Sequence, residues 1–83
     1  MKIEDFAIIV RSDPRFYHKE VRGYKNNTCR TLKSITEDGF SVKDLEECTR
    51  VIVINSEDGT QFERELSDIS VFEEIIIISW FEG

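Results

Sequence analysis

The sequence has little of what flexible or membrane-bound proteins contain. It includes one proline and four glycines among 83 residues, which argues against linkers and low-complexity tails. The longest uninterrupted apolar runs are Phe6–Val10 and Ile75–Ile78, far short of the roughly 20 residues that span a bilayer. The first residues mix charges and lack the apolar stretch of a secretory signal, so we expect a cytoplasmic protein without membrane contacts.

Residues that bind metals are equally scarce. The two cysteines, Cys29 and Cys48, lie far apart in sequence, and His18 is the only histidine. A structural zinc site needs about four clustered ligands, so neither a metal nor a cofactor is predicted. In the cytosol both thiols are expected to stay reduced and mostly buried, because a disulfide would require the fold to bring them together and would seldom persist there.

The composition is typical of one small globular domain that spans residues 1–83. Hydrophobic residues make up 40% of the chain, charged residues 34% and aromatic residues 11%. That balance supplies enough apolar surface for one core and excludes an intrinsically disordered chain.

The net charge of −6 is divided unevenly along the chain. Residues 1–35 carry eight basic and four acidic side chains, whereas residues 36–83 carry three basic and thirteen acidic ones. The acidic half should repel nucleic acid over much of the surface, because sequence-independent binding depends on many contacts between basic side chains and phosphates. The basic half leaves room for one local site that holds an anion. The alternative is that both sets of charges are simply solvated and pair across strands.

Local patterns in the first half predict a strand followed by a helix. Phe6–Val10 is short and rich in β-branched residues, as a buried strand requires. Ser12-Asp13-Pro14 is typical of a helix N-terminus, and a helix is expected over 14–22. The residues that recur at helical spacing are Phe16, Tyr17, Glu20, Val21 and Tyr24. A strand is expected over 27–36, and Ser41-Val-Lys-Asp44 has the spacing of a capping box that opens a further helical turn.

The second half is dominated by strand patterns. Arg50–Asn55 is one strand, and Asp58-Gly59 predicts the hairpin turn that follows it. Thr60–Leu66 alternates with a period of two, and Ser67-Asp68 is expected to kink or break this strand. Glu74–Phe81 is the last strand, and its isoleucine run predicts coverage on both faces. The fold class is therefore α+β, as a small mixed β-barrel or curled sheet with one or two short helices.

The segment after the first helix gathers side chains that bind anions. Gly23 ends the helix and permits a left-handed turn, which places Lys25 between helix and strand. Thr28 and Arg30 are two positions apart on the following strand, so they project from the same face. An ammonium, a hydroxyl and a guanidinium, with the amide of Asn27, can bind a carboxylate, a phosphate or the polar edge of a base. The alternative is a helix-capping turn in which Arg30 pairs with an acid of the C-terminal hairpin.

This segment resembles the signature of ASCH domains, members of the PUA-like β-barrel superfamily, which usually contain G-x-K-x-x-E-x-R. Here the pattern is Gly23, Lys25, Thr28 and Arg30, with threonine in place of glutamate. That form is similar to bacterial acetylcytidine amidohydrolases, whose lysine and threonine act in amide hydrolysis with a glutamate elsewhere. The resemblance therefore implies Lys25 and Thr28 as catalytic residues. The candidate acids are Glu63, Glu65 and Asp44, and the sequence does not choose among them.

The chain is also similar to small uncharacterised phage and prophage proteins with a K-x-N-T-x-R core. That resemblance extends to Phe62 and Arg64 in the C-terminal hairpin and to Trp80, which is expected to anchor the core with its indole N–H at the rim. It implies an accessory or anti-defence role. The acidic C-terminal half would then dock onto a basic protein partner by mimicking nucleic-acid phosphates.

Three functions follow from these patterns. The first is a binding module that holds a nucleotide-like or RNA ligand through Gly23, Lys25, Asn27, Thr28 and Arg30. The second is the protein-contact role of the acidic half. The third is hydrolysis of an amide on a modified nucleoside. The first hypothesis is the one that the basic segment favours, and it makes the chain a binding protein rather than an enzyme.

Overall fold

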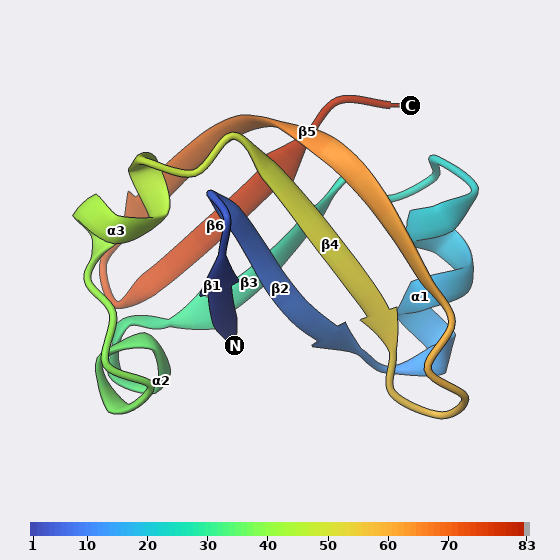
Figure 1. Cartoon of the computed structure of the whole chain (residues 1–83), viewed down its shortest axis with the longest axis horizontal. Coiled ribbons are helices and arrows are strands. Elements are labelled where there is room, and N and C mark those ends of the chain that lie inside the picture. The colour runs from blue at the N-terminus through green and yellow to red at the C-terminus, as the bar shows by residue number, and fades with distance from the viewer. Residues whose placement is uncertain (83) are drawn as a thin grey trace.

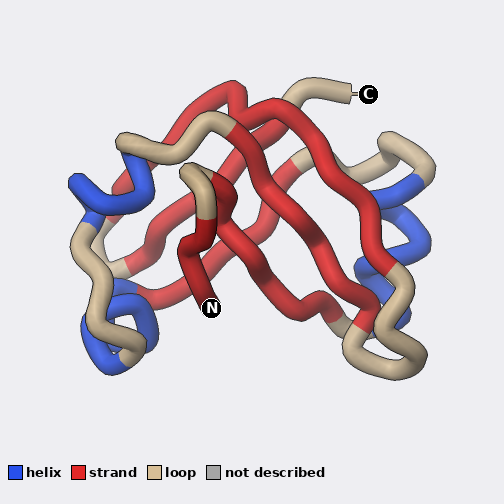
Figure 2. The backbone as a smooth tube through the Cα atoms, in the orientation of Figure 1, coloured by secondary structure: helices blue, strands red, loops and turns tan. Residues whose placement is uncertain are grey.

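The computed structural model describes residues 1–82 as one curled, six-stranded mixed sheet with three short helices (Figures 1 and 2). The elements in chain order are β1 (Lys2–Glu4), β2 (Ala7–Ser12), α1 (Pro14–Val21), β3 (Asn27–Thr31), α2 (Leu32–Glu37), α3 (Val42–Glu46), β4 (Arg50–Asn55), β5 (Gln61–Phe72) and β6 (Ile75–Trp80). The strand order is β1-β2-β4-β5-β6-β3, so β1 and β3 are the edges of a sheet that does not close. The α+β class is confirmed.

One hydrophobic core lies on the inner face of the curled sheet. Alternate residues of β2, β4 and β6 point inward because side chains alternate between the faces of a strand. The buried members of this core are Ile8, Val10, Tyr17, Ile35, Leu45, Val51, Val53, Phe62, Ile76, Ile78 and Trp80. None of the helices described in residues 1–82 is long and apolar enough to cross a membrane.

Most of the elements expected from local patterns are confirmed. Asp13 is the N-cap of α1, with its side chain accepting a hydrogen bond from the Arg15 amide, and Pro14 occupies the first turn. The capping box between Ser41 and Asp44 opens α3. Strand β5 continues through Ser67-Asp68, where a kink or break is expected, and its pairing with β6 shifts register between Leu66 and Asp68.

Two elements differ from expectation. The strand predicted over 27–36 ends at Thr31, whose side chain accepts a hydrogen bond from the Ser34 amide and caps helix α2. The described chain therefore has three helices rather than one or two. The sequence does not predict strand β1, because a three-residue strand with two charged side chains gives no hydrophobic alternation.

The isoleucine run in β6 is fully buried on one face only. Ile76 and Ile78 are fully buried, whereas on the outer face Ile75 is 39% exposed and Ile77 is half-buried, so the expectation of coverage on both faces is wrong at Ile75. Trp80 anchors the core at 3% exposure, but its indole nitrogen is buried without a hydrogen-bond partner among the described residues rather than lying at the rim. Phe81, the next residue, is 55% exposed.

Candidate functional site

The turn between α1 and β3 brings Lys25 against a buried carboxylate. Gly23 has a φ of 82°, so the helix ends in the left-handed turn that the glycine predicts. The Lys25 ammonium then lies 3.1 Å from Oε2 of Glu20, whose residue is only 1% exposed. Ser12 Oγ donates to the other oxygen of the same carboxylate at 2.5 Å. Glu20 is thus a buried anion held by the end of β2 and by the turn after α1.

Sequence reasoning missed Glu20 as a site residue, although a signal for it was present. Glu20 follows Tyr17 by three positions, so both lie on the face of α1 that points into the core. An acidic residue at such a position is costly to bury unless it has partners, which makes it a marker of a specific interaction. The acids considered instead lie elsewhere: Glu63 pairs with Arg50 at 3.2 Å, Asp44 caps α3, and Glu65 is exposed on β5.

Lys25 and Arg30 also satisfy carbonyls on the free edge of β3. The Trp80 amide donates to the Asn26 carbonyl, so the backbone groups of Asn26 face β6. Successive residues of a strand direct their backbone groups to opposite sides, and the carbonyls of Asn27 and Cys29 therefore point away from β6. The Lys25 ammonium donates to the Asn27 carbonyl, and Arg30 Nη1 donates to the Cys29 carbonyl at 2.7 Å. These two cations therefore cover an edge that would otherwise be open to pairing with another strand.

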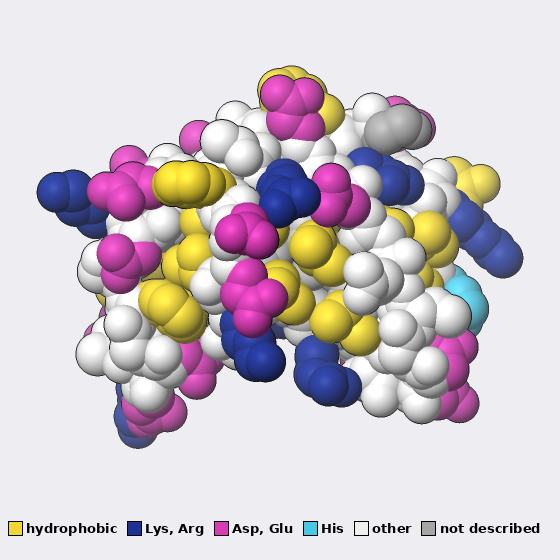
Figure 3. Space-filling model, in the orientation of Figure 1, with side chains coloured by type: hydrophobic (Ala, Val, Ile, Leu, Met, Phe, Trp, Pro, Cys, Tyr) yellow, Lys and Arg dark blue, Asp and Glu magenta, His cyan; other side chains and the backbone are white. Residues whose placement is uncertain are grey.

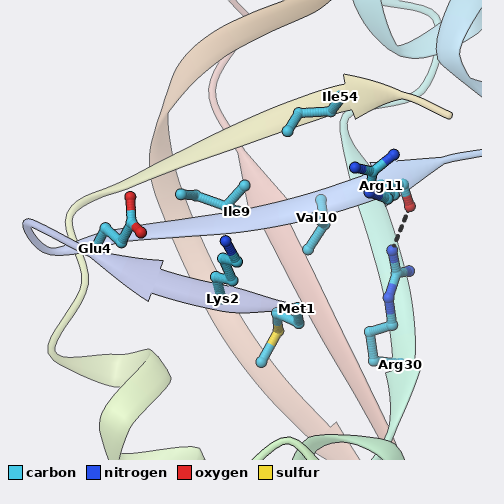
Figure 4. Close-up of a pocket in the computed structure, with 8 residues that line it drawn as sticks. All are labelled: Met1, Lys2, Glu4, Ile9, Val10, Arg11, Arg30 and Ile54. Atoms are coloured by element: carbon cyan, nitrogen blue, oxygen red, sulfur yellow. Dashed lines mark hydrogen bonds between the residues drawn. The ribbon is translucent and has the colours of Figure 1, made fainter. Parts of the chain in front are cut away.

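Arg30 connects the edge strand β3 to β2 across the gap where the sheet does not close. Its Nη2 donates to the Arg11 carbonyl on β2 at 2.8 Å (Figure 4). Its Nη1 donates to Thr28 Oγ1 at 2.8 Å. Burial lowers the pKa of Arg30, with Glu20 and Cys29 opposing that shift. Among residues 1–82 no carboxylate lies within ion-pair distance of this guanidinium. Arg30 is a half-buried cation with unused N–H donors.

A cavity of about 450 Å³ lies beside Arg30, along β2 between β1 and β3 (Figure 4). Its basic lining consists of Lys2, Arg11 and Arg30, and its aliphatic lining consists of Ile9, Val10 and Ile54. Met1 and Glu4 complete it, and Glu4 is its one acidic side chain. Lys2 and Arg11, like Arg30, make no ion pair within the described chain. In the space-filling view, basic side chains lie at the lower edge of this face, below hydrophobic ones (Figure 3).

The residues predicted from the motif are close together but do not share this cavity. Arg30 lines it, whereas Lys25 is ion-paired with Glu20 and Thr28 is buried beneath the Arg30 guanidinium. Asn27 is exposed, and Gly23 faces the side chain of Glu82, which lies 2.8 Å from the position of a Cβ there. The sequence does not predict the cavity residues Lys2 and Arg11, because strand pairing rather than a motif brings them together.

The two thiols are free and less buried than expected. Cys29 is exposed on β3, and Cys48 is partly exposed after α3, so the prediction of mostly buried thiols is wrong. Burial, and then the negative charges of Asp44 and Glu47, raise the pKa of Cys48. No cluster of three or more potential metal ligands occurs among residues 1–82.

Comparisons with known proteins leave the resemblance to ASCH domains as a prediction. No model of a known protein family matches the sequence, and no curated protein does either.

Proposed function

We propose that the chain is a small binding module for a nucleotide-like or RNA ligand, held in the cavity beside Arg30. The observation that carries this proposal is the set of three cations, Lys2, Arg11 and Arg30, that have no ion-pair partners among the described residues of a chain of net charge −6. A phosphate would supply the missing counter-ion, and its oxygens can accept from the N–H groups of Arg30 that remain on Nε and Nη2.

The rest of the cavity supports a ligand with an apolar face. Ile9, Val10 and Ile54 give it an aliphatic side on which a base or sugar can pack. Lys25 and Thr28, the motif residues outside the cavity, act here by holding the strand and the guanidinium in place. The motif thus serves binding through Arg30, with Lys25 and Thr28 as positioning residues.

The test is a titration of the isotope-labelled chain with cytidine and adenosine monophosphates, inorganic phosphate and a short single-stranded RNA, followed by NMR. Saturable shifts are expected at Arg11, Arg30 and Ile54. Arg11→Ala should weaken binding about tenfold while leaving the carbonyl that Arg30 contacts intact. Lys43→Ala, a basic position on α3 outside the cavity, is the matched control and should change nothing. If all four probes leave the spectrum unmoved, the binding function is rejected.

The buried Glu20 favours a second candidate, hydrolysis of an amide on a modified nucleoside. The resemblance implies a lysine and a threonine that act with a glutamate, and Glu20 is the carboxylate in contact with Lys25. Thr28 Oγ1 accepts a hydrogen bond from Arg30 Nη1, which leaves the O–H of Thr28 as a donor to a base or to the substrate. Water would cleave the C–N bond of an N-acetyl group, releasing acetate and the free amine.

Incubation with N4-acetylcytidine and chromatography of the products tests this second candidate. Cytidine and acetate should accumulate with the native chain and not with Thr28→Val, which keeps the shape of the side chain and removes its hydroxyl. Equal amounts of product from the two proteins, or none from either, would reject hydrolysis by this site. Neither result bears on the binding titration, which uses the native chain and Arg11→Ala and requires no hydrolysis.

A further inference from the structure

A second cavity, of about 580 Å³, lies between the β1–β2 turn and the segment around α3. It shares no lining residue with the cavity beside Arg30. Its apolar lining consists of Ile3, Phe6, Phe40 and Cys48. We call this cavity the acidic groove, because every charged side chain that lines it is a carboxylate.

The carboxylates of the acidic groove are Asp5, Asp44 and Glu47. None of them forms an ion pair within residues 1–82, and only Asp44 has a side-chain partner there, Ser41 in the capping box. Two of them, Asp44 and Glu47, lie close enough to Cys48 to add to burial in raising the pKa of its thiol. The groove therefore combines an apolar lining with three carboxylates that form no ion pair within the described chain.

Phe6 extends the apolar surface beyond the groove. Asp5 and Phe6 form the two-residue loop between β1 and β2, with φ values of 49° and 61°. A ring at a positive φ is unfavourable, and glycine is the usual residue at this place in such a loop. The loop is nevertheless fixed, by hydrogen bonds from the Thr49 amide to the Phe6 carbonyl at 2.9 Å and from Arg50 Nη2 to the Asp5 carbonyl at 3.1 Å. The ring is 67% exposed, so it contributes little to the core.

We propose that the acidic groove binds a segment of a partner protein in which arginine or lysine alternates with leucine or an aromatic residue. The apolar side chains of this segment pack on Phe6 and Phe40, and its cations lie against Asp5 and Glu47. Charge complementarity selects a basic partner, and burial of apolar surface supplies most of the affinity. A chain segment fits better than a small cation, because only a chain reaches both the interior of the groove and the exposed ring of Phe6.

A blocked hexapeptide of alternating leucine and arginine is the probe, titrated into the isotope-labelled chain and followed by NMR. Saturable shifts are expected at Gly39, Phe40 and Cys48, which line the groove. Two control peptides replace arginine by glutamate or leucine by serine, and each should bind at least about tenfold more weakly. Equal binding of the serine–arginine peptide would mean attraction by charge alone and would overturn the proposal.

Variants separate the groove from the rest of the surface. Phe6→Gly should bind the probe about tenfold more weakly while melting at a higher temperature, because glycine relieves the left-handed backbone. The double variant Asp5→Asn with Glu47→Gln should weaken binding to a similar extent and reduce its dependence on salt. Phe72→Ser is the matched control and should bind the probe as the native chain does, since Phe72 is 68% exposed on β5 outside the groove.

Three further outcomes would overturn the proposal. They are unchanged affinity in Phe6→Gly, shifts confined to residues outside the groove, and binding of free arginine amide as tight as that of the hexapeptide. The last result would assign the groove to small cations instead. Failure of the groove proposal leaves the proposed nucleotide-binding function intact, because Arg11→Ala tests that function and Arg11 does not line the groove.

Discussion

The carboxylate of Glu20 lies 3.1 Å from the ammonium of Lys25, and this pair joins the inner face of α1 to the turn before β3. The two partners differ in exposure, since the Glu20 side chain is 1% exposed and that of Lys25 is 30% exposed. Removal of the lysine would leave a buried anion with Ser12 as its remaining partner. The ammonium is therefore as much a structural ion as a candidate catalytic group.

Lys25→Met should lower the free energy of unfolding by about 2–3 kcal/mol, because an uncompensated buried charge is costly. Urea denaturation at neutral pH measures this loss. Lys19→Met is the matched control: Lys19 is exposed on α1 without an ion pair among the described residues, and its change should stay within about 0.5 kcal/mol. Adding Glu20→Gln to Lys25→Met should restore part of the stability. Equal effects of the two lysine substitutions would show that the pair is not coupled.

Arg30→Met should lower stability by about 2 kcal/mol, because it removes hydrogen bonds from a charged donor to the carbonyls of both β2 and β3. Arg30→Lys keeps the charge but not the fork, so it should recover less than half of the loss. Urea denaturation measures both changes, with Lys33→Met on α2 as the control. Sedimentation should show more self-association of Arg30→Met, because the free edge of β3 is then uncovered. Full rescue by lysine would contradict the bridging role of the guanidinium.

Stability at acid pH should depend on Asp13. The side-chain hydrogen bond from Arg15, followed by the one from its backbone, holds the pKa of Asp13 below its ordinary value. The folded state is therefore favoured by this group above about pH 4, and the contribution is lost as the pH falls through the lower folded-state pKa. Asp13→Asn keeps a capping side chain and should make the urea midpoint less sensitive to pH between about pH 5 and about pH 2.

The control for this acid dependence is Glu37→Gln, at the end of α2, where the carboxylate has no ion pair within the described chain. This substitution should leave the slope of the urea midpoint against pH as it is in the native chain. An equal slope for the native chain and Asp13→Asn would show that the cap does not contribute to acid unfolding.

The two thiols should react at different rates with iodoacetamide. Cys29 is exposed, whereas Cys48 is partly buried and has a raised pKa, so less of it is thiolate at about pH 8. Mass spectrometry of a time course should show Cys29 modified first and Cys48 at least about tenfold more slowly. In strong denaturant the difference should disappear. Faster reaction of Cys48 in the folded chain would contradict its described environment.

Local sequence determined the elements whose signals are complete within a few residues. Asp13 and Pro14 define the start of α1, and Ser41 and Asp44 form a capping box, because each pair depends only on neighbours in the chain. The turn at residues 56–59 follows the same rule, since it joins β4 and β5 as a hairpin with Gly59 at a φ of 78°.

Tertiary structure decided what no local pattern contains. Strand β1 exists because β2 pairs with it, and β3 ends at Thr31 because its partner there, Ile75, is the first residue of β6. The role of Glu20 required knowing that Lys25 folds back onto α1. The same holds for both cavities, which are lined by segments distant in the chain.

The sequence by itself therefore determined the α+β class, most of the strands and the basic segment that ends in Arg30, because alternation, capping and turn chemistry act over a few residues. Only the tertiary structure decided which carboxylate meets Lys25, which cations surround the cavity and where acidic side chains remain without partners. The cavities depend on strand order and on the curl of the sheet, which bring together residues that no short-range rule connects, whereas the Glu20–Lys25 pair depends on the turn that ends α1.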